Sequence, residues 1–175
     1  MSLDAAVEVV TGTVVFTDIV GFTAFTADEG DDRALEVLGV QETAVVEALP
    51  PGARVVKELG DGLMLWFPDA ASAVVTSLRL QAELADRYES EEFPLWVRMG
   101  AHHGTQRCRR EDLVGHDVNV AARIVDLAAP GEVLVSEATV AAARRVLEGV
   151  EFAEVGPVVV KGIPDAVWIY RAELA

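Results

Sequence analysis

Two aspartates stand at positions where an acidic side chain could do chemistry. Asp18 belongs to the segment 16–23, whose sequence is FTDIVGFT, and comes just after an apolar run. Asp61 lies between two glycines in the segment 59–62. A buried carboxylate without a partner is costly, and two that meet repel each other unless a cation lies between them. The pair is therefore a candidate Mg²⁺ site. Each residue alone also has an ordinary explanation, because Asp18 fits a helix or turn cap and Asp61 fits a hairpin turn.

A second set of polar residues lies farther along the chain. Asn119 and Arg123 are four residues apart and would share one face of a helix. Two carboxylates and an arginine are what a two-metal phosphoryl-transfer site requires, since the guanidinium stabilises charge on the transferring phosphate. The alternative is a surface arginine that pairs with Asp126 or Glu132.

Lysine is rare in this chain, so the positions of Lys57 and Lys161 are informative. Lys57 interrupts an apolar strand just before the turn with Asp61, and Lys161 follows a run of valines. For both, a solvated lysine that protects a strand edge is the competing interpretation. The glycine turn 20–23 adds backbone N–H groups at a helix start, which could hold phosphate oxygens.

His102 and His103 are the other conspicuous pair. Adjacent residues of a strand point to opposite faces, so these two cannot chelate one ion together. We therefore expect core or hydrogen-bonded histidines. The sequence contains no Walker A, G-x-G-x-x-G, G-x-S-x-G, H-E-x-x-H or C-x-x-C motif.

The scaffold that positions these residues can be read from hydrophobic spacing, glycines and prolines. We expect strands at 12–17, 55–59, 63–67, 94–103, 133–135, 158–160 and 167–170, and helices starting near Asp31, Asp69, Gly115 and Ser136. The order β-α-β-β-α-β followed by a helix-rich tail predicts an α+β, ferredoxin-like fold with an antiparallel-containing sheet and helices on one face. In its usual strand order, 4-1-3-2, strands 1 and 3 are neighbours, so Asp18 and Asp61 would meet.

Length and composition set the broad class. The 175 residues fit one domain, which we place at 12–175 after a flexible lead-in at 1–11. The longest apolar runs are far shorter than the ~18 residues that a membrane span needs, and the first residues lack the basic region of a signal peptide. The single cysteine, Cys108, excludes an internal disulfide and fits a reducing cytoplasm.

The net charge of −15 limits the partners. A chain this acidic repels nucleic acid and anionic membranes over most of its surface, so we expect contact with neither. It would also repel a nucleoside triphosphate, which must then be held by metal ions and a few well-placed cations.

With these motifs in place, the chain resembles the catalytic domain of class III nucleotidyl cyclases, from about Gly12 to Arg171. The segment 16–23 is similar to the family's first metal motif, and 57–64 (KELGDGLM) to the second, with its purine-reading lysine. The segment 112–123 (DLVGHDVNVAAR) resembles the part that carries the second base-reading residue and the transition-state pair. The segment 160–163 resembles the terminal phosphate-binding segment.

The resemblance implies a role for each candidate residue. Asp18, Asp61 and the backbone carbonyl of Ile19 would bind two Mg²⁺ or Mn²⁺ ions per active site. Arg123 would stabilise charge on the α-phosphate in the transition state, and Asn119 would orient the ribose. Lys161 would contact the β- or γ-phosphate. The candidate phosphate-binding loop consists of Val20, Gly21, Phe22 and Thr23.

Lys57 and Asp112 would choose the base. A lysine can donate to N1 of adenine and an aspartate can accept from its 6-amino group, whereas guanine presents N1–H and O6, the opposite polarity. The resemblance therefore predicts conversion of ATP to 3′,5′-cyclic AMP and pyrophosphate, by in-line attack of the ribose 3′-hydroxyl on the α-phosphate. Asp117 is an alternative to Asp112, but the family's spacing of seven residues before Asn119 selects Asp112.

The family's domains dimerise head to tail with the sites at the interface. The resemblance implies that Asp18 and Asp61 serve one site of a homodimer, while Lys57, Asp112, Asn119 and Arg123 of the same chain serve the other. Two other functions remain open at this point. One is a non-enzymatic nucleotide-binding module with a cyclase fold, and the other is a guanylyl cyclase, which Lys57 and Asp112 disfavour.

Overall fold

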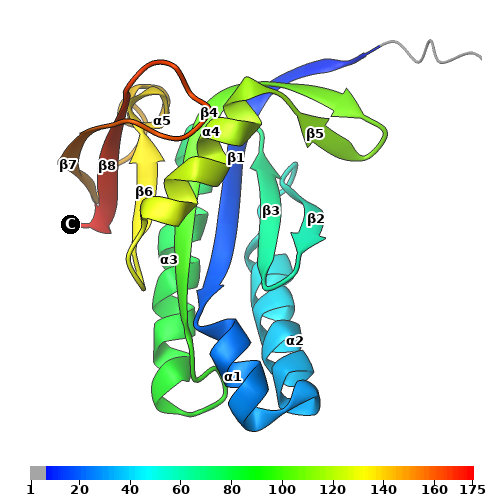
Figure 1. The fold of residues 1–175 in the computed structure, drawn as a ribbon. Coiled ribbons are helices and arrows are strands. Elements are labelled where there is room, and N and C mark those ends of the chain that lie inside the picture. The colour runs from blue at the N-terminus through cyan, green and yellow to red at the C-terminus, as the bar shows by residue number, and fades with distance from the viewer. Residues whose placement is uncertain (1–6) are drawn as a thin grey trace, which may run out of the picture.

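One mixed sheet carries the candidate residues in the computed structural model, which describes residues 7–175. Its strands follow the order β2-β3-β1-β4-β6-β8-β7, and β5 pairs with the outer part of β4 (Figure 1). The strands are β1 (Val9–Val20), β2 (Arg54–Leu59), β3 (Gly62–Phe67), β4 (Trp96–Arg109), β5 (Asp112–Val114), β6 (Val133–Ser136), β7 (Val150–Val158) and β8 (Val167–Leu174). The helices are α1 (Phe22–Glu29), α2 (Asp31–Ala48), α3 (Ala70–Glu89), α4 (His116–Leu127) and α5 (Glu137–Ala143).

The first half of the chain confirms the ferredoxin-like prediction. The strands β2, β3, β1 and β4 are neighbours in this order and are all antiparallel, which is the predicted arrangement 4-1-3-2. β6 then joins β4 in parallel, and β8 and β7 extend the sheet beyond it. The α+β class is confirmed with it.

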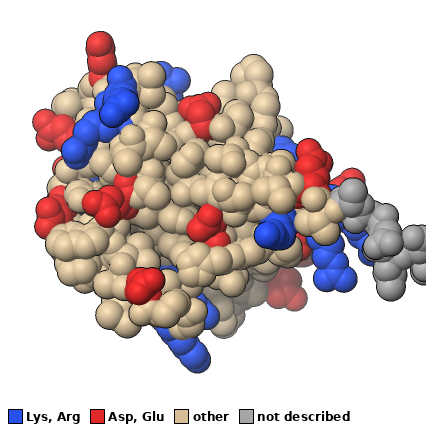
Figure 2. Space-filling model, turned by 90° about the horizontal axis from the view of Figure 1, so that it is seen from above, with Lys and Arg blue, Asp and Glu red and all other residues tan. Residues whose placement is uncertain are grey.

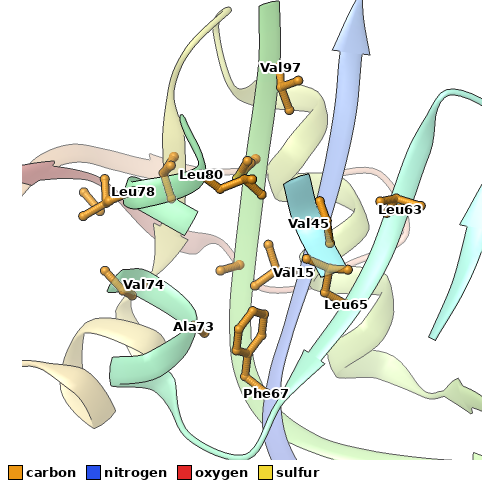
Figure 3. Packing of buried hydrophobic residues seen from close by; sticks show 14 of the residues in the cluster. Val15, Val45, Leu63, Leu65, Phe67, Ala73, Val74, Leu78, Leu80 and Val97 are labelled. Carbon is orange, nitrogen blue, oxygen red and sulfur yellow. The ribbon is translucent and has the colours of Figure 1, made fainter. Parts of the chain in front are cut away.

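Alternating side chains of the central strand build two cores on opposite faces of the sheet. Val15 points to the face covered by α2, α3 and α5, where it belongs to a core cluster that includes Val45, Val74 and Phe67 of β3 (Figure 3). Val14 and Phe16 point the other way and pack with α4. Burying a side chain of this size contributes about 1.5–3 kcal/mol, so the strong alternation fixes which face each neighbouring residue takes.

Helices therefore cover both faces. The helices of the β-α-β-β-α-β unit, α2 and α3, lie on one face as the ferredoxin-like pattern predicts. The later helix α4 crosses the opposite face in front of β1 and β4 (Figure 1), which the prediction of helices on one face did not include. Its small buried residues, such as Ala121, allow this close approach.

Several predicted boundaries need correction. β1 begins at Val9, so part of the expected lead-in 1–11 is strand, and residues 1–6 lie outside the described residues. The strand expected at 158–160 is β7, which ends at Val158; Lys161 thus lies in a turn and not at the end of a valine strand. The helix start expected at the glycine turn 20–23 is that of α1, a helix separate from α2, whereas the short β5 was not predicted.

Two of the expected helix starts, at Asp69 and Ser136, are capped by side-chain hydrogen bonds. The Asp69 carboxylate accepts a hydrogen bond from the Ser72 amide at 2.7 Å, and the Ser136 hydroxyl accepts one from the Thr139 amide at 3.3 Å. Asp31, near which a helix was expected to start, lies in the first turn of α2, where its negative charge interacts favourably with the helix dipole.

The sequence has a marked excess of acidic residues, with a net charge of −15. Figure 2 shows acidic and basic side chains interspersed over the face seen from above. In residues 7–175 none of the helices combines the length and the apolar character that crossing a membrane requires.

Candidate active site

The register of β1 and β3 brings the two aspartates together. Asp18 pairs with Gly62, the residue directly after Asp61. A Cβ atom on Gly62 would lie 2.2 Å from the carbonyl oxygen of Thr17, so only glycine lets the turn approach β1 this closely. The Thr17 hydroxyl also accepts a hydrogen bond from the Leu63 amide at 3.1 Å, which ties the start of β3 to β1.

The electrostatics of this pair favour a bound cation. Burial raises the pKa of Asp61, and the charge of Asp18 and a hydrogen bond with it raise the pKa further. Asp18 in turn accepts hydrogen bonds from Arg98, at 2.8 Å from Nε, and its Oδ2 lies 2.7 Å from Nη2. Two carboxylates that crowd each other in this way gain from a divalent ion.

The donor set fits Mg²⁺ or Mn²⁺. Within the described part of the chain, no cluster of three or more His, Cys, Asp or Glu side chains could enclose a metal by itself. Mg²⁺, however, is commonly held by one or two carboxylates together with substrate phosphates and water. Asp18, Asp61 and the carbonyl of Ile19 match that open kind of site.

A cavity surrounds the carboxylates. It has a volume of about 380 Å³ and is lined by Asp18, Asp61 and Arg98. The remainder of its wall includes Ile19 and the loop that the sequence predicts to hold phosphate, namely Val20, Gly21, Phe22 and Thr23. Gly21 is the residue that caps the start of α1, so N–H groups of this helix end lie beside the carboxylates.

Asn119, Arg123 and Lys161 line a second cavity, of about 490 Å³. The first two are exposed on α4, as the i, i+4 spacing predicts, while Val118 and Ala121 of the same helix are buried. Lys161 reaches the cavity from the turn after β7. Arg123 lies 3.8 Å from the Asp126 carboxylate, and both side chains are half exposed, so this ion pair is weak.

Lys57 and Asp112 form an ion pair between β2 and β5. The Nζ to Oδ2 distance is 2.9 Å, and each side chain is 40% exposed. Burial alone would raise the pKa of Asp112, but hydrogen bonds from Lys57 and the Leu113 amide and the charge of Lys57 outweigh it, so the pKa is lowered. β2 is an edge strand, so the edge-protection interpretation of Lys57 also stays compatible with the geometry.

The histidines are hydrogen-bonded, as predicted. His102 Nδ1 lies 2.6 Å from the Ser136 hydroxyl, and its Nε2 lies 3.1 Å from Asp117. His103 Nδ1 lies 2.9 Å from the Thr13 hydroxyl. Burial lowers the pKa of His102, and the hydrogen bond and charge of Asp117 offset only part of this effect.

Comparison with known proteins identifies the family of the chain. Residues 6–172 match the family described as the adenylate and guanylate cyclase catalytic domain. The chain belongs to this family. It is 32% identical over 161 residues to a Mycobacterium tuberculosis protein described as the pH-sensitive adenylate cyclase MT1302; the match covers 91% of this chain but only 40% of that protein.

Solved structures agree on the fold of this cyclase domain. The adenylyl cyclase CyaB from P. aeruginosa superposes with a TM-score of 0.86 at 23% identity, covering 97% of this chain and 96% of that one. The guanylyl cyclase Cya2 superposes with a TM-score of 0.80 at 22% identity, covering 97% and 95%. The same fold thus occurs in proteins named for either base, so the fold by itself does not indicate the base.

Sequence reasoning missed two residues of the cyclase domain that contact the two aspartates, Arg98 through the carboxylate of Asp18 and Gln41 through the backbone carbonyl of Asp61. Arg98 is the direct cross-strand partner of Asp18 on β4, and counting the register of the predicted strands could have found it. Gln41 is buried on α2, and its amide lies 3.4 Å from the Asp61 carbonyl and 3.5 Å from the Thr17 hydroxyl. Only the three-dimensional packing of α2 shows that contact.

Proposed function

We propose that this domain is an adenylyl cyclase that converts ATP to 3′,5′-cyclic AMP and pyrophosphate. The observation that carries the proposal is the contact of Asp18 with Asp61 at the end of β1, inside a cavity whose wall is a helix-start loop. This combination suits two divalent ions and a polyphosphate. The family of the chain and its adenylate cyclase relative support the same activity.

Different residues of the chain bind the metal ions, bind the phosphates and stabilise the transition state. Asp18, Asp61 and the Ile19 carbonyl would hold two Mg²⁺ or Mn²⁺ ions, which would lower the pKa of the ribose 3′-hydroxyl and neutralise charge on the triphosphate. The loop 20–23 donates backbone N–H groups to phosphate oxygens. Arg123 stabilises the negative charge that develops on the α-phosphate during in-line displacement.

Substrate orientation belongs to the second group of residues. Asn119 orients the ribose, and Lys161 contacts the β- or γ-phosphate. Lys57 donates to adenine N1 and Asp112 accepts from the 6-amino group, and their 2.9 Å pairing places donor and acceptor side by side. Guanine would meet a donor with its own N1–H donor, so ATP is favoured over GTP.

A head-to-tail homodimer completes the site. The carboxylates line one cavity of the chain, whereas Asn119, Arg123 and Lys161 line another. In our proposal the first cavity of one chain faces the second cavity of its partner, which gives two equivalent sites per dimer and none per monomer. The chain spans about 40% of the length of its M. tuberculosis relative, so the regulatory input of the whole protein is outside this proposal.

The deciding experiment is a direct assay. The purified chain is incubated with ATP or GTP and with Mn²⁺ or Mg²⁺, while cyclic nucleotide and pyrophosphate are measured together. Cyclic AMP and pyrophosphate in equal amounts, formed from ATP in preference to GTP, are the expected result. Nucleotide binding without product at high protein concentration would refute catalysis by this chain and favour a binding module.

A further inference from the structure

The carboxylate of Asp117, which the base-reading proposal leaves unused, is fully engaged inside the domain. Its Oδ1 lies 3.1 Å from His102 Nε2, and its Oδ2 accepts a hydrogen bond from the Thr105 amide at 2.7 Å. Asp117 belongs to the first turn of α4, and both partners belong to β4. The side chain therefore joins the start of this helix to the strand beneath it.

The strand is shaped to receive this carboxylate. A Cβ atom on Gly104 would lie 2.2 Å from Asp117 Oδ2, so a side chain there would take the place of the carboxylate. Four residues earlier, a Cβ atom on Gly100 would lie 2.3 Å from the backbone nitrogen of Val125. Gly100, His102 and Gly104 alternate along β4 and share the face that α4 covers, so the strand holds the helix at both ends.

His102 is itself fixed on its other side. Its Nδ1 lies 2.6 Å from the Ser136 hydroxyl, which caps α5 and lies 3.0 Å from the Thr139 hydroxyl. The Thr139 amide donates to the Ser136 oxygen at 3.3 Å. The serine O–H can therefore donate to Nδ1, and Nε2–H can donate to Asp117. The imidazole thus links the start of α4 to the β6–α5 junction.

Two candidate catalytic side chains lie between the two holding points. Asn119 is two residues after Asp117, and Arg123 is two residues before Val125. Both are exposed on α4 and line the 490 Å³ cavity. Any rotation or lifting of the first turn of α4 moves Asn119 directly, and a displacement of about 1 Å at such a group can cost about 100-fold in rate.

We propose that Asp117 is a positioning residue, which acts through His102 and the Thr105 amide to fix α4 on β4 and so places Asn119 and Arg123 for the reaction. This inference rests on the proposed cyclase function for its effect on turnover. Its structural half, the attachment of α4, does not depend on that function.

Two variants test the attachment in different ways. Asp117→Asn removes the charge and turns one of the two acceptor oxygens into a donor. Gly104→Ala leaves Asp117 and His102 unchanged in sequence but displaces the carboxylate by steric contact, and Gly104 has no positive φ that would strain an alanine. We expect both variants to lower kcat by about 10- to 100-fold, with a much smaller change in KM for ATP.

Matched controls separate this effect from general ones. Asp32→Asn makes the same chemical change at an exposed position in the first turn of α2, and Gly39→Ala makes the same change where a Cβ atom meets no neighbour within 4 Å. Both controls should retain wild-type kcat. A similar loss in Asp32→Asn would show that the helix-end charge, and not the contact with β4, is responsible, and would overturn the proposal.

Two readouts are independent of catalysis. Hydrogen exchange of the α4 amides should become faster in Asp117→Asn and Gly104→Ala, while the amides of α3 keep wild-type protection. NMR titration of His102 should give a lower pKa in Asp117→Asn than in wild type, because the raising effect of Asp117 is lost while burial and the charges of His103 and His116 remain.

The outcomes distinguish the two proposals. Absence of cyclase activity in the wild-type chain would refute the proposed function, and hydrogen exchange and the His102 titration would still decide on the attachment. An active wild type whose two variants keep both kcat and α4 protection would overturn the inference and leave the cyclase proposal intact.

Discussion

Exchange of the proposed base-reading pair, Lys57 and Asp112, is the sharpest test of substrate choice. The double change Lys57→Glu with Asp112→Gly reverses one hydrogen-bonding position and removes the other, so the pocket then suits guanine better than adenine. Two hydrogen bonds that involve a charged group are at stake, each worth about 1.5–3 kcal/mol. Their sum, about 3–6 kcal/mol, corresponds to a change of about 10²- to 10⁴-fold in the ratio of kcat/KM for ATP and GTP.

The structure predicts that this change does little to the fold. Lys57 and Asp112 are each 40% exposed, and ion pairs of this kind contribute about 1 kcal/mol or less to stability. For a domain of this size, that corresponds to a fall in Tm of at most about 2–4 °C. Substrate preference and stability should therefore respond very differently to the same pair of substitutions.

The assay measures kcat/KM for both nucleotides with Mn²⁺ and the Tm of the same samples. A matched control is Arg171→Glu with Glu173→Gly on β8, a similarly exposed ion pair on a strand that lines neither proposed cavity. An unchanged ATP/GTP ratio together with a fall in Tm larger than that of the control would refute the reasoning. Lys57 would then be an edge-strand residue whose ion pair is structural.

Three further predictions follow from the cavities and from His102. Asp18→Ala and Arg123→Ala should each be inactive, and a mixture should regain activity because one site of the mixed dimer is intact; no recovery despite subunit exchange would contradict shared sites. Mn²⁺ at about 100 times its Kd should raise the Tm of wild type by about 5–10 °C but not that of Asp61→Asn, and an equal shift would exclude Asp61 as a ligand. The pKa of His102 is lowered in the folded state. The neutral imidazole therefore stabilises the fold fully above about pH 6.5, and this stabilisation is lost as the pH falls below that value. The urea midpoint of His102→Gln should accordingly fall less than that of wild type between pH 7 and pH 5.5.

Local signals in the sequence were sufficient for the ferredoxin-like half. Prolines and glycines mark the ends of α2 and the β2–β3 turn, and Asp69 marks the start of α3. Once the strand order 4-1-3-2 is assumed, the meeting of Asp18 with Asp61 follows from adjacency alone. The contact is a consequence of topology, so two residues 43 positions apart can be paired from the sequence alone.

The second half was harder to predict because its elements depend on long-range packing. β5 has three residues and exists through its pairing with β4, so it has little intrinsic signal. The valines at 158–160 suggested a strand, but Val159 is 85% exposed and Val160 packs with α4 residues in a separate core cluster. Tertiary contacts, and not β propensity, decided where β7 ends.

The pairing of site cations explains how so acidic a chain could accept a polyanion. In the described structure Arg98 contacts Asp18, Lys57 contacts Asp112, and Arg123 lies near Asp126. The side chains of the Lys57 and Arg123 pairs are about 40–57% exposed, so these two pairs are weak and can be exchanged for a base or a phosphate at small cost. The Arg98 pair is about three-quarters buried and has two short contacts, so it stays with Asp18.

The same pairing also limits unwanted binding. A cation that already has a carboxylate partner attracts loose anions less than an isolated one, and the net charge of −15 repels them further. A ligand that replaces these ion pairs must supply divalent ions to the site carboxylates and hydrogen-bond acceptors to the lysine and arginine side chains. A metal–nucleotide complex has that composition, so the charge pattern is compatible with the substrate class that we propose.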